Sequence, residues 1–265
     1  MGAAAARHCV GGYSWGMQSQ DTTDIGVETL QRLRRSGQIR AISLDLDDTL
    51  WPIWPTIAKA EAVLLQWLAA HAPATAAYLG DTARVRALRH EIVELRPDLK
   101  ADLSGLRRES IRLALTRAGD DPALAEPAFD EFFAARQRVE LFDDALPALE
   151  FLSQRWPVVA LSNGNANVHV VGIGQHFRAS LSASGAGMAK PEARFFHAAA
   201  DAVGVAPEHV LHIGDDAALD AQGAMDAGMH AVWLNRAQLA WPHEGPEPHV
   251  TVASLLQLCQ GLADR

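Results

Sequence analysis

Three carboxylates stand close together in the run Asp45-Leu46-Asp47-Asp48-Thr49-Leu50. The run follows an apolar stretch over residues 39–44, rich in β-branched side chains, which is typical of a buried strand. Like charges at this spacing repel one another unless a cation is bound or some of them stay protonated. Carboxylate oxygens are hard ligands that suit a divalent ion, and Mg²⁺ is the ion that we expect here.

Polar residues also follow two later apolar stretches of the chain. Ser162 and Asn163 follow one of these stretches, and Asp215 and Asp216 follow the other. In a parallel sheet the carboxyl ends of all strands meet at one edge, where α/β proteins bind their ligands. Lys190 precedes a proline that is suited to the first position of a helix, and it can reach the same edge.

Together these residue types can carry out phosphoryl transfer. One carboxylate can attack phosphorus and form an aspartyl phosphate, which water then cleaves. A second carboxylate can protonate the leaving alkoxide and afterwards activate the water. Ser162, a backbone N–H and Lys190 can hold the phosphoryl oxygens, and Mg²⁺ can offset the charge that would keep a carboxylate away from a phosphate.

The elements that must position these residues alternate between strand and helix in the second half of the chain. This alternation predicts an α/β fold with a Rossmann-like parallel sheet and helices on both faces. Strands are expected over residues 39–44, 158–161, 180–184, 210–213 and 230–234, helices over 191–203 and 217–227, and a final strand turn and helix over 250–262.

Between the first two strands the chain has a helical pattern. Apolar residues recur at helical spacing over residues 57–71, 83–95, 103–118 and 127–139. Four helices without a strand between them predict a small bundle, inserted directly after the carboxylates where it can cover a site. We therefore assign residues 39–51 and 147–265 to a catalytic core and residues 52–146 to a helical cap.

Residues 1–38 differ from the rest and are expected to form a flexible N-terminal extension, with Met17 as an alternative start and a short amphipathic helix over residues 24–36 before the first strand. The 265 residues carry a net charge of -9 without a basic stripe, which argues against nucleic-acid and membrane partners. Cys9 and Cys259 have no metal-binding spacing and are expected to be plain thiols in a reducing cytoplasm. We expect a monomer or a small homo-oligomer.

Four segments, in order, resemble the motifs of the haloacid dehalogenase superfamily. They are Asp45-Leu46-Asp47-Asp48-Thr49, Ser162-Asn163-Gly164, Lys190-Pro191, and Gly214-Asp215-Asp216 with Asp220. The resemblance covers residues 39–262 and implies a phosphoric monoester hydrolase in which Asp45 is the nucleophile and Asp47 the general acid and base. It implies further that Ser162, Asn163 and the catalytic Lys190 bind the phosphate.

The same resemblance implies a set of Mg²⁺ ligands and a cap. Asp45, the backbone carbonyl of Asp47 and Asp215 would bind the ion, with Asp216 or Asp220 supporting the metal or the nearby lysine. The inserted helices are similar to the caps that members of this superfamily carry between their first two motifs.

An acid at position 47 favours a phosphate ester, because a halide leaving group needs no proton. Further likeness points to phosphatases that act on 5-amino-6-(5-phospho-D-ribitylamino)uracil or flavin mononucleotide (FMN) in riboflavin metabolism. We expect Arg107 of the cap to contact such a substrate and Trp51 to stack on its ring, although Trp51 could equally pack the hinge between core and cap. The alternatives are a nucleotide or sugar-phosphate phosphatase, a phosphomutase, and a binding protein that keeps the fold without the activity.

Overall fold

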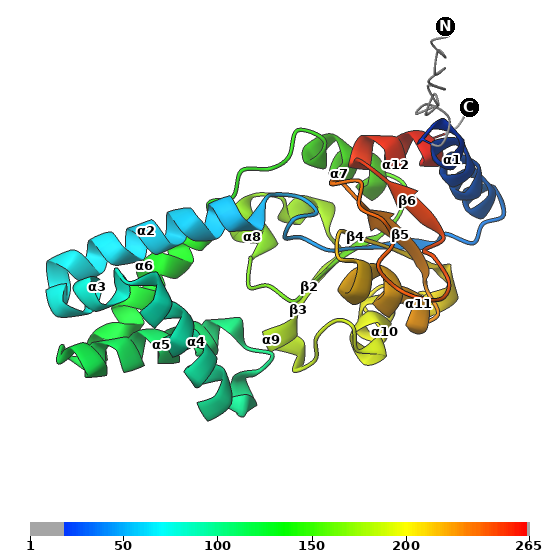
Figure 1. The fold of residues 1–265 in the computed structure, drawn as a ribbon. Coiled ribbons are helices and arrows are strands. Elements are labelled where there is room, and N and C mark those ends of the chain that lie inside the picture. Colours follow the sequence, from blue (N-terminus) through cyan, green and yellow to red (C-terminus); the bar gives the residue numbers. More distant parts are fainter. Residues whose placement is uncertain (1–18, 264–265) are drawn as a thin grey trace, which may run out of the picture.

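The chain folds into a layered core with a group of helices projecting from one side (Figure 1). The computed structural model describes the backbone of residues 19–263 and the side chains of residues 26–263. Residues 1–18, which include the alternative start at Met17, lie outside the described residues.

The described residues form six strands and a larger number of helices. The strands are β1 (Ala41–Leu44), β2 (Val158–Ser162), β3 (Ala179–Ser182), β4 (Val210–Gly214), β5 (His230–Leu234) and β6 (Val250–Val252). The α-helices are α1 (Ser19–Arg35), α2 (Ile53–His71), α3 (Pro73–Leu79), α4 (Thr82–Leu95), α5 (Leu103–Ala118), α6 (Ala125–Arg136), α7 (Ala145–Ser153), α8 (Val168–Val171), α9 (Ala183–Ala186), α10 (Ala193–Asp201), α11 (Gly223–Asp226) and α12 (Leu255–Leu262). A π-helical segment, η5 (Ala217–Gln222), precedes α11.

All six strands are parallel and lie in the order β3-β2-β1-β4-β5-β6. The central strand β1 lies between β2 and β4, with Leu44 opposite Ala160 on one side and Ile213 on the other. Between β3 and β4 the chain crosses from one half of the sheet to the other through α10, so the strand order reverses its direction beside β1. This arrangement confirms the predicted α/β class and puts the ends of β1, β2 and β4 beside one another.

Successive residues of β1 point to opposite faces of the sheet and help to build two cores. Ile42 and Leu44 pack with residues of α1, α7 and α12 on one face. Ala41 packs on the other face, where Phe195 and Phe196 of α10 are fully buried. Burial of the sheet on both faces explains why its strands are continuous apolar runs.

The segment between β1 and β2 forms the expected helical bundle, with its own apolar core of residues from α2, α5 and α6. The bundle has one α-helix more than predicted, because α3 begins with Pro73, and only Ala72 separates it from the end of α2 at His71. Proline at the first helical position loses no hydrogen bond, so the residue that stops one helix also starts the next. The two connections to the core lie side by side, since Phe142 N–H donates to the Leu50 carbonyl at 2.9 Å.

Part of the segment assigned to an N-terminal extension is helical and packs on the core. Leu30 and Leu33 of α1 are buried, and Leu30 lies against Gly261 of α12. The two ends of the described chain therefore lie close together (Figure 1). Across residues 19–263, none of the helices has the length and apolar character needed to cross a bilayer.

Candidate active site

The carboxyl edge of the sheet brings three aspartates together. Asp45 follows β1 directly, and its backbone N–H donates to the Ile213 carbonyl of β4 at 2.9 Å. Asp215 follows β4, and Asp220 lies on the π-helical segment η5 that comes next. One carboxylate oxygen from each of Asp45, Asp215 and Asp220 lies within 4.8 Å of the other two. The parallel pairing of β1 with β4 thus places side chains 170 and more residues apart in the sequence at one point.

Lys190 lies between two of these carboxylates and is buried with them. Its Nζ is 2.5 Å from Asp45 Oδ1 and 2.5 Å from Asp220 Oδ1. Asp220 also accepts the backbone N–H of Asp216 at 3.0 Å and lies 3.2 Å from His212 Nε2. Asp220 is therefore held from three sides and in turn holds the ammonium group next to Asp45.

The charges in this group do not balance. Burial, together with the charges of Asp220 and Asp215, raises the pKa of Asp45, and the Lys190 ammonium offsets only part of that rise. Burial and the charges of Asp220 and Asp48 raise the pKa of Asp215 to about 7. Burial would also raise the pKa of Asp220, but the Lys190 charge and the His212 hydrogen bond outweigh it and lower that pKa. One ammonium thus faces three carboxylates, a set that favours an additional cation.

The donor set suits Mg²⁺, which prefers hard oxygen ligands. Asp45 and Asp215, both expected as ligands, belong to the group of three, and so does Asp220. Asp216 does not belong to it, because its side chain is exposed and accepts the N–H groups of Ala218 and Leu219, each at 2.8 Å. The structure therefore brings Asp220, and not the Asp216 side chain, to the position where a metal or the lysine could be supported.

Asp47 lies apart from that group and faces the cap. Its Oδ1 and Oδ2 accept hydrogen bonds from Arg136 Nη2, at 2.6 and 2.8 Å. Trp51 Nε1 donates to Oδ1 at 2.8 Å. On the remaining side is Gly164, where an added Cβ would lie 2.3 Å from Asp47 Oδ2. These contacts hold the Asp47 carboxylate apart from the Asp45 carboxylate.

Trp51 does not occupy the place that we expected. Its ring is fully buried in the core cluster under β1, so it presents no face to a ligand. The alternative, that Trp51 packs the junction between core and cap, agrees with the structure. Trp54, one turn further along, is 75% exposed and lines a cavity between core and cap.

Asn163 also differs from its expected role in phosphate binding. Its Oδ1 accepts the Lys190 backbone N–H at 2.8 Å, and its Nδ2 donates to the Lys190 carbonyl at 3.0 Å. Both polar ends of the amide are therefore used to fix the backbone of Lys190. Ser162, by contrast, is buried at the end of β2, and within residues 26–263 its hydroxyl bonds only to the Gly164 N–H, as acceptor at 2.9 Å, which leaves its proton for a ligand.

A cavity of about 350 Å³ lies between the core and the cap. Asp47, Gly164 and Asn165 line it from the core, and the cap side includes Arg107 and Arg136. It opens beside the general acid that the motif predicts, which makes it the candidate substrate pocket.

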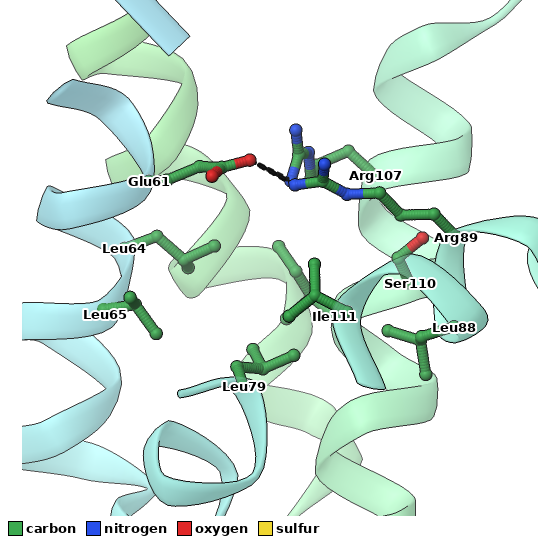
Figure 2. A pocket seen from close by; sticks show the side chains of 10 residues that line it. Glu61, Leu64, Leu65, Leu79, Leu88, Arg89, Arg107, Ser110 and Ile111 are labelled. Atoms are coloured by element: carbon green, nitrogen blue, oxygen red, sulfur yellow. Dashed lines mark hydrogen bonds and ion pairs between the residues drawn. The ribbon is translucent and has the colours of Figure 1, made fainter. Parts of the chain in front are cut away.

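Arg107 lies on the cap wall of this pocket as expected. Its Nη1 is 3.3 Å from Glu61 Oε1, and its guanidinium lies over the Phe132 ring, 4.4 Å from the ring centre. Arg89 pairs with the same carboxylate, so one glutamate serves two arginines. Figure 2 shows this charged group at one end of a small apolar pocket inside the cap, with Ile111 near its middle.

Arg136 was not expected from the motifs, although the sequence contains a signal for it. Phe129, Phe132 and Arg136 are spaced three and four residues apart, so the arginine continues the apolar stripe of α6. An arginine on the buried face of a helix needs a charged partner, and here that partner is Asp47.

Comparison with known proteins agrees with the motifs. The sequence model of the haloacid dehalogenase-like hydrolases matches residues 39–228. The chain is 32% identical over 205 residues to the 5-amino-6-(5-phospho-D-ribitylamino)uracil phosphatase YigB of Escherichia coli strain K12, covering 76% of this chain and 85% of that protein. A phosphoserine phosphatase of Thermus thermophilus is 36% identical over 136 residues, covering 49% of this chain and 55% of its own.

Solved structures show the same relationship. The crystal structure of a 2-haloacid dehalogenase from Pseudomonas syringae pv. Tomato DC3000 is 33% identical, with a TM-score of 0.78 over 84% of this chain and 98% of that one. The ordered motifs, the inserted cap and these matches lead to one conclusion: the chain belongs to the haloacid dehalogenase-like hydrolases.

Proposed function

We propose that this chain is a Mg²⁺-dependent phosphatase that hydrolyses a small-molecule phosphomonoester through an aspartyl phosphate on Asp45. The observation that carries the proposal is the pair of carboxylates: Asp45 lies against Lys190 at the sheet edge, and Asp47 lines the cavity where a leaving group would lie. The phosphatases among its relatives support this reading.

In the first step a carboxylate oxygen of Asp45 forms a bond to phosphorus and the bond to the bridging ester oxygen breaks. Asp47 gives a proton to that oxygen, so that the product leaves as an alcohol. Lys190 and the Ser162 hydroxyl donate to the phosphoryl oxygens. Asp45, Asp215 and the backbone carbonyl of Asp47 would hold Mg²⁺, which when bound reduces the repulsion between the phosphate and the carboxylates.

In the second step Asp47, now a carboxylate, takes a proton from water, and the hydroxide oxygen bonds to phosphorus. The bond between phosphorus and Asp45 breaks, which releases inorganic phosphate and restores the nucleophile. The same side chain thus acts as acid and then as base, and the contacts with Arg136 and Trp51 keep it in place for both steps.

For the substrate we propose 5-amino-6-(5-phospho-D-ribitylamino)uracil or FMN, since a phosphatase named for the first of these is similar over most of both chains. A sugar-phosphate or nucleotide phosphatase is the second candidate. The likeness to a 2-haloacid dehalogenase does not favour halide release, because a halide leaves without a proton and an acid at position 47 would then have no function.

The division into core and cap at residues 51/52 and 146/147 stays a prediction. The helix α7 already packs on the core from Ala145 onward.

The proposal is tested by measuring phosphate release from a panel of phosphomonoesters with Mg²⁺ and then with EDTA. The panel contains the ribitylaminouracil phosphate, FMN, phosphoserine, nucleoside monophosphates and sugar phosphates. We expect magnesium-dependent release that Asp45→Asn abolishes, because the amide keeps the shape of the nucleophile without its charge. Activity of Asp45→Asn near the wild-type rate would exclude the covalent route. An isomerised sugar phosphate without free phosphate would indicate a mutase.

A further inference from the structure

Among the described residues, Arg136 is the one cap-helix residue that forms hydrogen bonds and an ion pair with Asp47. The arginine is the last residue of α6, its side chain is 1% exposed, and its Nη2 contacts both oxygens of the carboxylate. The next residue fixes its position, because Gln137 Oε1 accepts the Asn167 N–H at 2.7 Å and Gln137 Nε2 lies 3.4 Å from the Asn165 carbonyl. The end of α6 is thereby attached to the loop that follows β2.

The second terminal nitrogen of Arg136, Nη1, is buried and has no hydrogen-bond partner. A buried guanidinium N–H without an acceptor costs free energy, and such groups are uncommon. Five further buried nitrogens in the described part of the chain lack a partner, but of all these residues Arg136 alone lines the cavity that contains Asp47. Nη1 itself is covered, so an acceptor reaches it only when a ligand in that cavity shifts the groups that pack over it.

We propose that Arg136 is a substrate-binding and positioning residue of this site. Its Nη2 holds Asp47, and its Nη1 donates to an oxygen of the alcohol half of the phosphomonoester, next to the bridging oxygen that Asp47 protonates. The alcohol half is favoured over the phosphoryl group because the phosphoryl ligands Lys190 and Ser162 belong to the core edge, while Arg136 reaches the cavity from the cap. This inference rests on the proposed phosphatase activity.

The arrangement has a consequence for the choice of leaving group. An alkyl phosphate such as FMN needs a proton on its departing oxygen, whereas p-nitrophenyl phosphate leaves as a stable phenolate and needs little help. Loss of Arg136 would misplace Asp47 and would therefore slow the alkyl ester much more than the aryl ester. A role in cap folding alone would slow both esters equally.

The experiment compares Arg136→Gln and Arg136→Lys with Arg138→Gln and Arg138→Lys, since Arg138 is an exposed arginine two residues further along. The substrates are p-nitrophenyl phosphate and FMN, or the alkyl phosphate that the wild type cleaves fastest. For Arg136→Gln we expect kcat/KM on the alkyl ester to fall about 10²-fold, which is the effect of a misplaced acid. The factor by which kcat/KM falls on the aryl ester should be at least 10 times smaller. The Arg138 variants should match the wild type.

Arg136→Lys separates the two functions of the side chain, because one ammonium can hold Asp47 but cannot replace the second donor. We expect Arg136→Lys to keep most of kcat on the alkyl ester and to have a higher KM. This variant also tests the proposal if Arg136→Gln does not fold. Inhibition by inorganic phosphate should stay within about twofold of the wild type. Equal losses of kcat/KM on both esters, or no loss, would overturn the proposal. An inhibition by inorganic phosphate that is 10-fold weaker would also overturn it, because Nη1 would then bind the phosphoryl group. Wild-type protein without phosphatase activity would instead overturn the proposed function.

Discussion

At Gly164 the backbone lies close to both Asp47 and Ser162. A methyl group there would lie 2.3 Å from Asp47 Oδ2 and 3.2 Å from Ser162 Oγ, distances that force the acid to move. Position 164 therefore needs glycine, because a side chain there would take the space that Asp47 and Ser162 occupy.

We expect Gly164→Ala to lower kcat at least about 10-fold, since a displacement of 1 Å can cost ~10²-fold in rate. Steady-state kinetics on the best panel substrate measures this effect. Gly26→Ala is the control, because a Cβ there meets its nearest neighbour at an ordinary 3.4 Å. A fully active Gly164→Ala enzyme would show that Asp47 is not held where the structure places it.

The ionisation of Asp215 links stability to pH and, in the proposed site, to Mg²⁺. Its pKa of about 7 lies above its ordinary value of 3.8, so in the metal-free protein the folded state keeps a proton that the unfolded chain has already lost. This group makes the free energy of unfolding fall as the pH rises from about 4 to about 7. Bound Mg²⁺ would replace the proton and stabilise the ionised form.

The expected result is that Mg²⁺ raises Tm more at pH 8 than at pH 5, where it must displace the proton. Thermal unfolding in EDTA and in excess Mg²⁺ at both pH values measures the difference. Asp215→Asn should remove most of the Mg²⁺ effect. An equal rise at both pH values would mean that Asp215 does not take part in binding the ion.

At the scale of elements, Asp144 joins three parts of the core. It precedes α7, accepts the Leu255 N–H of α12 at 2.8 Å, and receives both terminal nitrogens of Arg236, at 2.8 and 3.0 Å. Burial would raise the pKa of Asp144, but the Arg236 hydrogen bonds outweigh it and lower that pKa. The ionised form thus stabilises the fold above the ordinary carboxyl pKa, and this contribution is lost as the pH falls below about 4.

We expect Asp144→Asn to lower the free energy of unfolding at pH 7 by about 1–3 kcal/mol, the usual cost of losing a hydrogen-bonded charge. Urea denaturation checks the value, and the difference from wild type should shrink as the pH approaches 3. Its exposed neighbour supplies the control Asp143→Asn. If both variants lose the same amount, the contacts with Arg236 and Leu255 contribute nothing measurable.

The elements were easier to predict than the contacts between them. The helix over 103–118 and the strand over 230–234 agree with the structure at both ends, because a glycine after a helix and a short apolar run are local signals. The motif positions predicted that Asp45, Asp215 and Lys190 meet, since a parallel sheet fixes where strand ends lie. The direction of a side chain depends on packing across the fold, which the sequence does not give. For that reason the predicted contacts of Trp51 and Asn163 with the substrate differ from their contacts in the structure.

At the scale of the whole molecule, helices from the two ends of the described chain support each other. Leu30 of α1 is fully buried, and at Gly261 of α12 an added Cβ would lie 2.6 Å from Leu30 Cδ1. The helices can approach this closely only because position 261 has no side chain. The contact covers the face of the sheet opposite α10 and α11.

Leu30→Ala should lower the free energy of unfolding by about 2–5 kcal/mol, as for other leucines truncated in a core, while kcat at 25 °C stays unchanged. Urea denaturation and steady-state kinetics test the two parts. Leu256→Ala, at a position of α12 that is 55% exposed, is the matched control. A loss of activity without a loss of stability would show that α1 influences the site directly.

The hydrogen bond between Phe142 N–H and the Leu50 carbonyl means that the chain leaves the sheet and returns to it at almost the same point. The pairing of β1 with β2 lies outside the segment between these two residues, whatever the length of that segment. Helices can thus be added, removed or exchanged there during evolution without shifting β1 against β2. The helical bundle can therefore change while the carboxylates at the edge of the sheet keep their positions.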